Sequence, residues 1–478
     1  MSENFIQTSK RVIPTWAVLA VCCVAQFMVV LDVSIVNVAL PGMRADLDLS
    51  ATGQQWIINA YTLTFAGFML LGGRAADLFG RRRVFVLGLS VFTICSLLGG
   101  LAEIGGELIA ARAVQGVGAA ILAPATLSLI TTTFTEPGAR RRALGAWSAT
   151  QASAAAAGVL AGGVLTDVLD WRWVLFVNVP IGTALIAAAL VSLTESRSDN
   201  RPRLDVGGAA TVTGGLALLV YGIVSTDSRA WGSAATIGTL LGATALLAVF
   251  VLIESRLSAQ PLVPLSVFRL RSLAAANGIA VMIGAALFGT YYFVSLYLQQ
   301  TNGYSPLQAG LAFLPVGLAT LIGALCAARL VPYLGVRGQL ITGLVLVAGG
   351  LVLLGQLSTG DSYFGHVFGA LVLAGLGVGL SFVPLTIAAT ADVPMHQAGL
   401  ASGLINTTRQ IGGAVGLAVM ATAATSSGTA GYGRAFWIAA AATGIGAGLA
   451  VALPGKTKPA PQATRHEKTA ESPEMIDA

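Results

Sequence analysis

Long apolar runs separated by short polar segments dominate the sequence. Most runs are about 18 to 27 residues long, and a helix needs about 20 apolar residues to cross a bilayer. The pattern therefore predicts an all-α integral membrane protein with fourteen transmembrane helices. The expected spans lie near residues 14–40, 52–72, 84–102, 107–131, 141–165, 173–193, 206–225, 233–254, 273–298, 307–328, 340–357, 364–390, 400–424 and 433–453.

Two charged connectors, 194–205 and 254–272, divide these runs into groups of six, two and six. We therefore expect an N-terminal six-helix bundle within residues 1–200 and two inserted transmembrane helices within 201–260. A C-terminal six-helix bundle follows within 261–455. The remaining residues, 456–478, are polar and contain proline, which predicts a disordered cytoplasmic tail.

Composition and charge exclude a soluble protein. Only 10% of the 478 residues are charged and 55% are hydrophobic, whereas soluble domains carry about 25% charged residues. The net charge of +6 comes from basic residues in the short loops, which is a topology signal and not a nucleic-acid patch. With the N-terminus inside, 21 basic residues fall in cytoplasmic segments and 4 in the opposite loops. We expect a multi-pass protein of the cell membrane with both termini in the cytoplasm.

Asp32 places a carboxylate inside the first apolar run, in the stretch that ends at Pro41. A charged side chain at mid-helix costs about 2.5 to 3.5 kcal/mol on insertion scales. Such a residue usually lines a polar cavity, pairs with a cation or carries a proton. The alternative is a position near the outer interface, but about nine residues, or roughly 13 Å of helix, separate it from Pro41. The sequence favours a functional role.

Arg112 is the natural partner for this carboxylate. It lies in the fourth span, in the same membrane half as Asp32, and shares a helix face with Gln115, Gly116 and Ala119. Burial disfavours a charged carboxylate and a nearby arginine favours it, so the pair predicts a site for proton coupling. The alternative for Arg112 is a side chain that extends to the outer interface.

The loop after the second span combines glycines, an acid and several arginines. Its motif residues are Gly73, Asp77, Gly80, Arg81 and Arg82. The glycines permit a tight turn, and Asp77 can cap the next helix or pair with an arginine. The loop therefore predicts a conformational latch, with a plain positive-inside anchor as the alternative. A weaker copy, 328–337, follows the tenth span, so the two halves resemble a repeat.

Small and polar residues in other spans suggest packing and binding roles. Gly158, Gly162 and Gly163 on the fifth span allow close helix packing. Polar and aromatic residues on several spans are candidates for the lining of a substrate cavity, although aromatic residues near helix ends also form interface belts. The candidates are Asn37, Gln55, Trp56, Asn59, Gln115, Gln151, Tyr291, Tyr292, Phe293, Asn406, Arg409 and Gln410.

These motifs together resemble the major facilitator superfamily and, within it, the fourteen-helix drug:proton antiporters. The first-span signature matches from Leu31 to Pro41, with Ser34 in place of the usual Thr. The loop signature matches at the five residues named above and departs at Ala75 and Leu78. The fourth-span signature matches at Arg112, Gln115, Gly116 and Gly118, whereas the usual Gly-Pro of the fifth span is Gly158-Val159. The resemblance implies two six-helix bundles around a central cavity, with the seventh and eighth helices inserted between them.

The expected function is proton-driven export of lipophilic small molecules or antibiotics. The alternative within transport is a dedicated exporter of one endogenous metabolite or antibiotic, and a nutrient symporter ranks below both. The expected partners are a small-molecule substrate, protons and the lipid bilayer, and the chain is expected to be a monomer. The four cysteines lie in apolar runs and give no metal-ligand set. No clustered nucleophile, cofactor motif or phosphate-binding loop indicates an enzyme or an ATP-driven pump.

Overall fold

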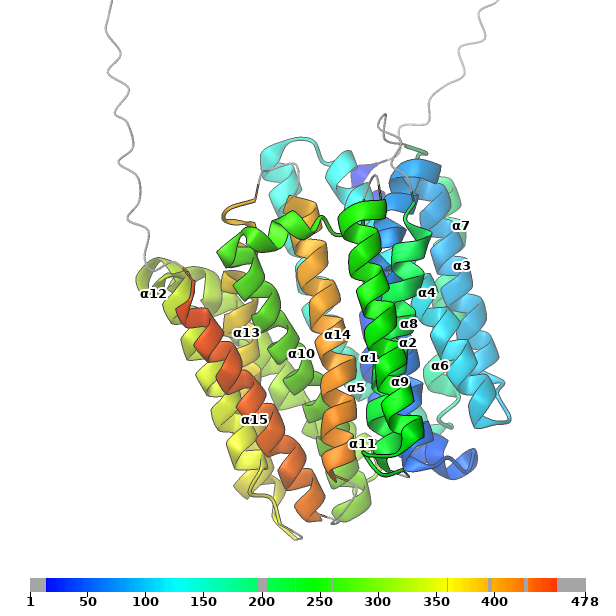
Figure 1. The fold of residues 1–478 in the computed structure, drawn as a ribbon. Helices are drawn as coiled ribbons and strands as arrows, with labels where there is room; N and C mark the ends of the chain where they lie inside the picture. Colours follow the sequence, from blue (N-terminus) through cyan, green and yellow to red (C-terminus); the bar gives the residue numbers. More distant parts are fainter. Residues whose placement is uncertain are drawn as a thin grey trace, which may run out of the picture.

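The computed structural model describes residues 14–196, 204–227, 229–258, 261–358, 360–393, 398–424 and 429–453. All regular structure within these ranges is helical. The first turn of α1 and the last turn of α15 lie at the same end of the molecule, the top in Figure 1. We call this the terminal end and the other the opposite end. The expected tail, 456–478, lies outside the described residues.

The first bundle is built from helices that together run between the two ends of the molecule. They are α1 (Thr15–Asp46), α2 (Ala51–Phe79), α3 (Arg81–Gly100), α4 (Gly105–Thr133), α5 (Pro137–Val168), α6 (Trp173–Phe176) and α7 (Asn178–Ser192). The short α6 and α7 together form one span, interrupted at Val177. Helix α4 packs against α2 and α3, and α1 packs against α5. Glycine makes these approaches close: a Cβ at Gly88 would lie 2.9 Å from the carbonyl oxygen of Gly118.

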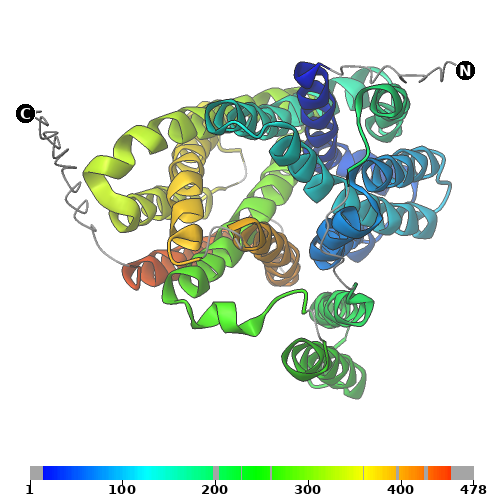
Figure 2. The ribbon, with the colours of Figure 1, turned by 90° about the horizontal axis from the view of Figure 1, so that it is seen from above.

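A helical hairpin follows at the edge of the molecule, as Figure 2 shows. It consists of α8 (Val206–Val224), the turn η1 (Ser225–Asp227), α9 (Ala234–Leu252) and its continuation η2 (Ile253–Leu257). Helix α8 packs against α2 of the first bundle and α14 of the second. At Gly67 of α2 a Cβ would collide with the side chain of Thr213. The hairpin is therefore fitted against both bundles.

The second bundle contains the remaining helices. They are η3 (Leu265–Arg269), α10 (Arg271–Leu296) with η4 (Tyr297–Thr301), α11 (Pro306–Ala312), α12 (Leu314–Leu354), η5 (Tyr363–Val367) with α13 (Phe368–Thr390), α14 (Ala398–Ala424) and α15 (Thr429–Val451). Helices α12 and α13 pack together, and α10 packs against α14 and α15. The division into three units at the expected boundaries is not tested by the helix bounds and stays a prediction.

Helix α12 is two helices that fold back on each other. Gly335 interrupts it with φ of 71° and ψ of 165°, a backbone conformation that only glycine adopts easily. The Gln339 side-chain amide donates to the carbonyl oxygen of Ala327, 3.0 Å away. In a straight helix, residues 12 apart are separated by about 18 Å. The segments 314–334 and 336–354 are therefore antiparallel neighbours.

Twelve helical segments of the described chain are long and apolar enough to cross a membrane, so the expected count of fourteen is not confirmed. The difference lies in two places. Residues 306–354 count as one segment of 49 residues, although the chain folds back at Gly335. Helix α14, with 27 residues, is not among the twelve.

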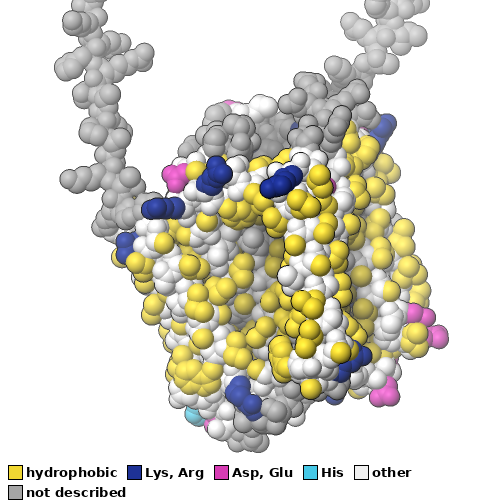
Figure 3. Space-filling view, in the orientation of Figure 1, with side chains coloured by type: hydrophobic (Ala, Val, Ile, Leu, Met, Phe, Trp, Pro, Cys, Tyr) yellow, Lys and Arg dark blue, Asp and Glu magenta, His cyan; other side chains and the backbone are white. Residues whose placement is uncertain are grey.

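The surface fits a lipid environment. Figure 3 shows hydrophobic side chains over the flank of the bundles and charged side chains gathered towards the two ends. Leu241 on α9 is 64% exposed and Leu325 on α12 is 66% exposed. An apolar belt of this kind is stable where hydrocarbon replaces water.

Candidate functional site

The carboxylate of Asp32 lies at the centre of a buried polar network in the first bundle. Its Oδ2 accepts a bond from Arg112 Nη1 at 2.6 Å. Its Oδ1 accepts from Gln115 Nε2 and from Asn178 Nδ2, each at 2.9 Å. Asp32 is 0% exposed and Arg112 is 2% exposed. Three donors on two oxygens match the ionised carboxylate, which only accepts hydrogen bonds.

Further contacts fix the positions of these partners. The guanidinium of Arg112 also donates to Gln115 Oε1 at 2.8 Å, and it lies 4.3 Å from the centre of the Tyr61 ring. The amide of Asn178 donates a second bond to Ser96 Oγ at 3.0 Å. Ser96 in turn donates to the carbonyl oxygen of Leu175. Helices α1, α2, α3, α4 and α7 therefore all contribute to one network.

Glycines on α4 let this helix pack closely against α2 and α3. A Cβ at Gly116 would collide with the carbonyl oxygen of Tyr61 on α2, and one at Gly118 would lie 2.7 Å from the backbone nitrogen of Phe92 on α3. Arg112 and Gln115 are three residues apart, so both side chains leave the same face of α4. The small residues of the α4 motif thus face α2 and α3, and its polar residues bond to Asp32 on α1.

Asp32 and Arg112 are both enclosed within the bundle and bonded to each other. Asp32 does not border an open cavity in this conformation. Sequence analysis did not assign Asn178 or Ser96 to the site. An asparagine in an apolar run, two residues before Pro180, was the available signal for Asn178, whereas Ser96 had none.

A second polar cluster lies on α1, α4 and α5, nearer the terminal end. Gln26 donates to Gln151 Oε1 at 3.5 Å, and Thr126 donates to Gln26 Oε1 at 3.5 Å. Trp147 Nε1 donates to Thr126 Oγ1 at 3.2 Å. Gln151 was a predicted cavity residue; its partner Gln26 is buried, and so is Thr126, which bonds to Gln26. The cluster is neutral, so it can take part in binding only by hydrogen bonding and stacking.

Helix α2 carries polar groups that have no partner among the described residues. Asn59 is 0% exposed, and neither its amide oxygen nor its nitrogen is bonded. Gln55 Oε1 and Thr62 Oγ1 are likewise buried and unbonded. Spacings of four and three residues place Gln55, Asn59, Thr62 and Met69 on one face of α2. Met69 touches Asn406 of α14, so this face is directed at the second bundle.

The remaining predicted cavity residues occupy different environments. Asn37 donates within its own helix to Val33, and Trp56 contacts the Tyr221 ring of α8. Arg409 donates to Asn406 Oδ1 at 2.7 Å. Gln410 is buried on the same helix, α14.

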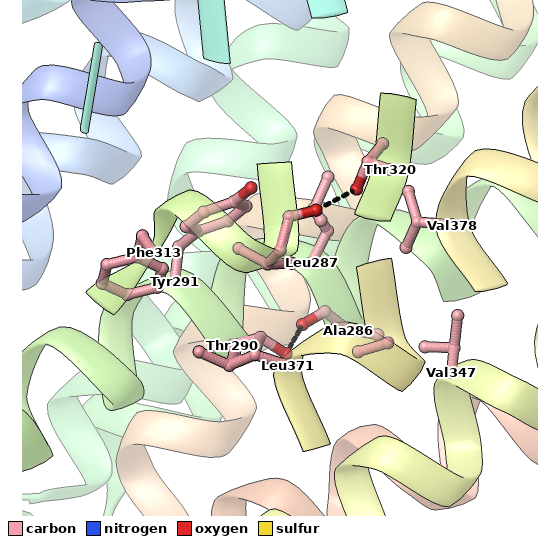
Figure 4. Close-up of a pocket in the computed structure, with 11 residues that line it drawn as sticks. Ala286, Leu287, Thr290, Tyr291, Phe313, Thr320, Val347, Leu371 and Val378 are labelled. Atoms are coloured by element: carbon pink, nitrogen blue, oxygen red, sulfur yellow. Dashed lines mark hydrogen bonds between the residues drawn. The ribbon is translucent and has the colours of Figure 1, made fainter. Parts of the chain in front are cut away.

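Tyr291 borders a small cavity inside the second bundle, drawn in Figure 4. The cavity measures about 20 Å³, which is room for one water molecule. Its polar residues Thr290 and Thr320 direct their hydroxyl groups at their own helices, and Tyr291 stacks on Phe313. The cavity is lined by Ala286, Leu287, Thr290, Tyr291, Phe313, Val316, Thr320, Val347, Leu371, Ala374 and Val378. In this conformation it is too small for a drug-sized ligand.

The other two aromatic residues predicted on this span do not line the cavity. Tyr292 and Phe293 are buried and contact each other edge to face. Phe293 packs against Tyr432 and Phe436 of α15. Both therefore belong to the packed interior of the second bundle in this conformation.

The junction between α2 and α3 contains the motif expected to act as a latch. Gly80 has a φ of 105° and forms the turn, whereas Gly73 lies within α2. Asp77 pairs with Arg81 at 3.1 Å. The expected capping role falls to another residue: Glu195, after α7, accepts from the backbone nitrogens of Arg82 and Arg83. Arg82 itself donates to the carbonyl oxygen of Leu190.

The glycines of α5 bring it against both bundles. A Cβ at Gly158 would lie 2.8 Å from the carbonyl oxygen of Leu31, and one at Gly162 would lie 2.7 Å from that of Ile35, both on α1. A Cβ at Gly163 would lie 2.7 Å from the carbonyl oxygen of Pro306 on α11. These residues hold α5 close to its neighbours, as the sequence predicts.

The bundles also meet at the opposite end through hydrogen bonds. Ser295 Oγ donates to the carbonyl oxygen of Asn37 at 3.0 Å, and Gln299 Nε2 donates to that of Val38 at 3.1 Å. Together with the contact of α5 and α11, these bonds close the two bundles against each other at this end.

Residues 22–417 match the family model described as Major Facilitator Superfamily. The chain belongs to this superfamily. The superfamily consists of transporters, so the chain is a multi-pass membrane transporter and not an enzyme. The Asp32 network lies in the first bundle of a fold that moves solutes, where an intramembrane carboxylate is a functional candidate.

Several relatives are similar over most of the chain. The cephamycin export protein CmcT of Amycolatopsis lactamdurans is 44% identical over 447 residues, which cover 90% of each chain. The puromycin resistance protein pur8 of Streptomyces alboniger is 42% identical, over 87% of this chain and 83% of its own length. The tetracenomycin C resistance and export protein of Streptomyces glaucescens is 34% identical, over 85% and 75%.

Solved structures of the superfamily share the fold. A peptide transporter, POT, in complex with sulfate matches with a TM-score of 0.67 and 15% identity, over 90% of this chain and 93% of its own. The human organic anion transporter MFSD10 matches with a TM-score of 0.60 and 18% identity, over 91% and 99%. At such identities the likeness concerns the arrangement of the helices alone.

The buried ion pair gives a stability prediction for this transporter. Arg112→Gln leaves the Asp32 carboxylate enclosed without its counter-ion, which costs about 3 to 5 kcal/mol when one partner is removed. Asp32→Asn in the same chain removes the isolated charge and should restore most of the loss. The measurement is the thermal unfolding temperature of the purified protein in detergent. Equal unfolding temperatures for the single and double variants would contradict the assignment.

Proposed function

We propose that the chain is a proton-driven exporter of lipophilic small molecules and belongs to the fourteen-helix drug:proton antiporters. Relatives at 34 to 44% identity are named as antibiotic resistance or export proteins. The proposed location is the cell membrane and the proposed state is a monomer. No cofactor is required, because the proton gradient supplies the driving force.

The observation that carries this proposal is the sealed network around Asp32. Its carboxylate receives three donors from α4 and α7. Protonation of Asp32 removes the charge that offsets Arg112 and makes one carboxyl oxygen a donor, so the bonds that this carboxylate accepts are weakened. The protonation state of Asp32 is therefore coupled to the packing of α1 against α4 and α7. A ligand drives a conformational change only through such a difference between states.

The closed contacts at the opposite end suggest how this coupling produces exchange. With the bundles held together there, a substrate reaches the site between them from the terminal end, which we assign to the cytoplasm. Opening the opposite end requires the α5–α11 contact and the bonds from Ser295 and Gln299 to break. Proton entry at Asp32 would favour the open form, and proton release to the cytoplasm would restore the closed one.

We also propose fourteen spans, with both termini in the cytoplasm. Residues 306–354 fold back at Gly335 and contain two apolar helices, each of about membrane length. Helix α14 runs for 27 residues between α10, α2 and α8. If the fold-back is counted as two spans and α14 is added, the number of membrane-spanning helices rises from twelve to fourteen. The distribution of basic residues then places the terminal end inside.

A dedicated exporter of one metabolite or antibiotic is the second candidate. The same Asp32 network would serve it, and the individually named substrates of the relatives favour it. A nutrient symporter ranks below both. Transport of a panel of compounds distinguishes the first two, since one substrate among many indicates a dedicated exporter.

The Asp77–Arg81 pair supports a latch at the cytoplasmic end. The pair spans the Gly80 turn between α2 and α3, and Asp77 is 40% exposed in its side chain. Such an exposed pair contributes little to folding, at most about 1 kcal/mol. A role in selecting one conformation is therefore separable from a role in stability.

The first prediction from this proposal concerns topology. Single cysteines replacing Gly303 and Ser358 should react with an impermeant reagent from outside, and one replacing Tyr333 only from inside, in a background without the four native cysteines. A cysteine at Ala478 should also react from inside. If residues 306–354 formed a single span, the cysteines at Gly303 and Ser358 would lie on opposite sides.

The second prediction concerns coupling. In proteoliposomes with an imposed pH gradient, Asp32→Asn should reduce drug-coupled proton movement at least tenfold, because the variant cannot exchange a proton. The panel includes puromycin and tetracenomycin C. Asp48→Asn, at an exposed position after α1, is the matched control and should behave as the wild type. Undiminished coupling in Asp32→Asn would exclude this residue as the proton carrier.

The third prediction concerns the latch. Asp77→Asn should reduce transport several-fold and leave substrate binding and the unfolding temperature nearly unchanged. Asp167→Asn removes an exposed acid near the opposite end of α5 and serves as the control. Normal transport by Asp77→Asn would reduce the loop to a topology anchor.

A further inference from the structure

Arg409 is a cation in the middle of a membrane-spanning helix. It is the twelfth residue of α14, roughly 16 Å along the helix from its first residue. The backbone of α14 is pressed against α10 at this level, because a Cβ at Gly284 would collide with the carbonyl oxygen of Arg409. The backbone of α14 is therefore fixed here, and the guanidinium lies beside Asn406 of the same helix and Phe382 of α13.

No described acid compensates this charge. The ion pairs of the described residues do not include Arg409, whose guanidinium donates to the neutral amide oxygen of Asn406. The guanidinium also lies 5.4 Å from the centre of the Phe382 ring of α13. Arginine has five N–H donors, and Arg409 uses one of them in its bond to Asn406. Within the described part of the chain, donors therefore remain for a ligand.

The contrast with Arg112 makes this arrangement unusual. Arg112 is neutralised by Asp32 at 2.6 Å and accepted by Gln115. The Asp32–Arg112 pair inside the first bundle is therefore neutral as a whole, whereas Arg409 carries a positive charge that no described acid offsets. In a medium of low dielectric constant an unpaired charge is costly, and an anion that binds beside it relieves that cost.

The surroundings of Arg409 provide the rest of a binding site. Asn406, its hydrogen-bond partner, touches Met69 on the polar face of α2. Phe382 contributes an aromatic wall. A cation, a neighbouring amide and an aromatic ring suit a ligand with one acidic group on an apolar body.

We propose that Arg409 binds the anionic group of the transported molecule, so that the substrates of this exporter are lipophilic organic acids, carboxylates above all. A guanidinium recognises a carboxylate through two parallel hydrogen bonds. The proposal rests on the proposed export function, but it concerns binding and does not require proton coupling.

The test compares acids with their neutral esters. Purified protein in phosphatidylcholine nanodiscs is titrated with a panel of aromatic and aliphatic carboxylates, among them 11-(dansylamino)undecanoic acid, and with the methyl ester of each. The wild type should bind at least some acids tenfold or more tightly than their esters. Arg409→Gln should remove this preference, and Arg409→Lys should keep most of it. Arg329→Gln, which removes an exposed arginine of α12, is the matched control.

Each outcome decides the proposal. Equal binding of every acid and its ester by the wild type would overturn it, and so would a loss in Arg409→Gln that is the same for acids and esters. A panel in which no acid binds, while added phosphatidylglycerol binds in an Arg409-dependent way, would assign the residue to a lipid and overturn the substrate role. Arg409-dependent acid binding without any proton-driven transport would support the site and contradict the export function. Export of neutral compounds alone would support the export function and contradict the proposed anion site.

Discussion

The enclosure of one charge, the Asp32 carboxylate, constrains the whole first bundle. A buried ion is tolerated only when its partner and its hydrogen bonds are all in place. Arg112, Gln115 and Asn178 supply them from α4 and α7, and the glycines of α4 hold that helix close to α2 and α3. A change in the charge of this carboxylate therefore alters the contacts of several helices at once.

The second bundle contains no matching pair among its described residues. Its intramembrane arginine has a neutral partner and an aromatic neighbour, and its one cavity near Tyr291 is small and apolar. The two halves share their architecture and differ in electrostatics. The turns at Gly80 and Gly335 both require a positive φ, which supports the repeat that the sequence indicates, while the charges have been distributed unequally between the halves.

Much of this arrangement follows from the sequence, because a charge in an apolar run is easily recognised. Asp32 and Arg112 stand out for this reason, and all fourteen predicted apolar runs fall on helices. Contacts between residues far apart in the chain were harder to foresee. Ser96 looks like any small residue of a packed helix, and Glu195 caps α3 from beyond α7. Tyr292 and Phe293 share a segment with Tyr291 but contact other neighbours. Their neighbours depend on how α10 is rotated about its axis, which the sequence alone does not give.

The α8–α9 hairpin gives the molecule two unlike flanks in the plane of the membrane. On one flank the line where α2 meets α14 lies behind α8, which touches both helices. On the other flank α5 meets α11 and α12 without such a cover, and Leu318 of α12 is 58% exposed. A solute that is dissolved in lipid therefore meets α8 when it approaches the space between the bundles from the first flank. From the second flank it meets α5, α11 and α12 directly. The inserted helices can bias the route of entry without contacting the solute at its binding site.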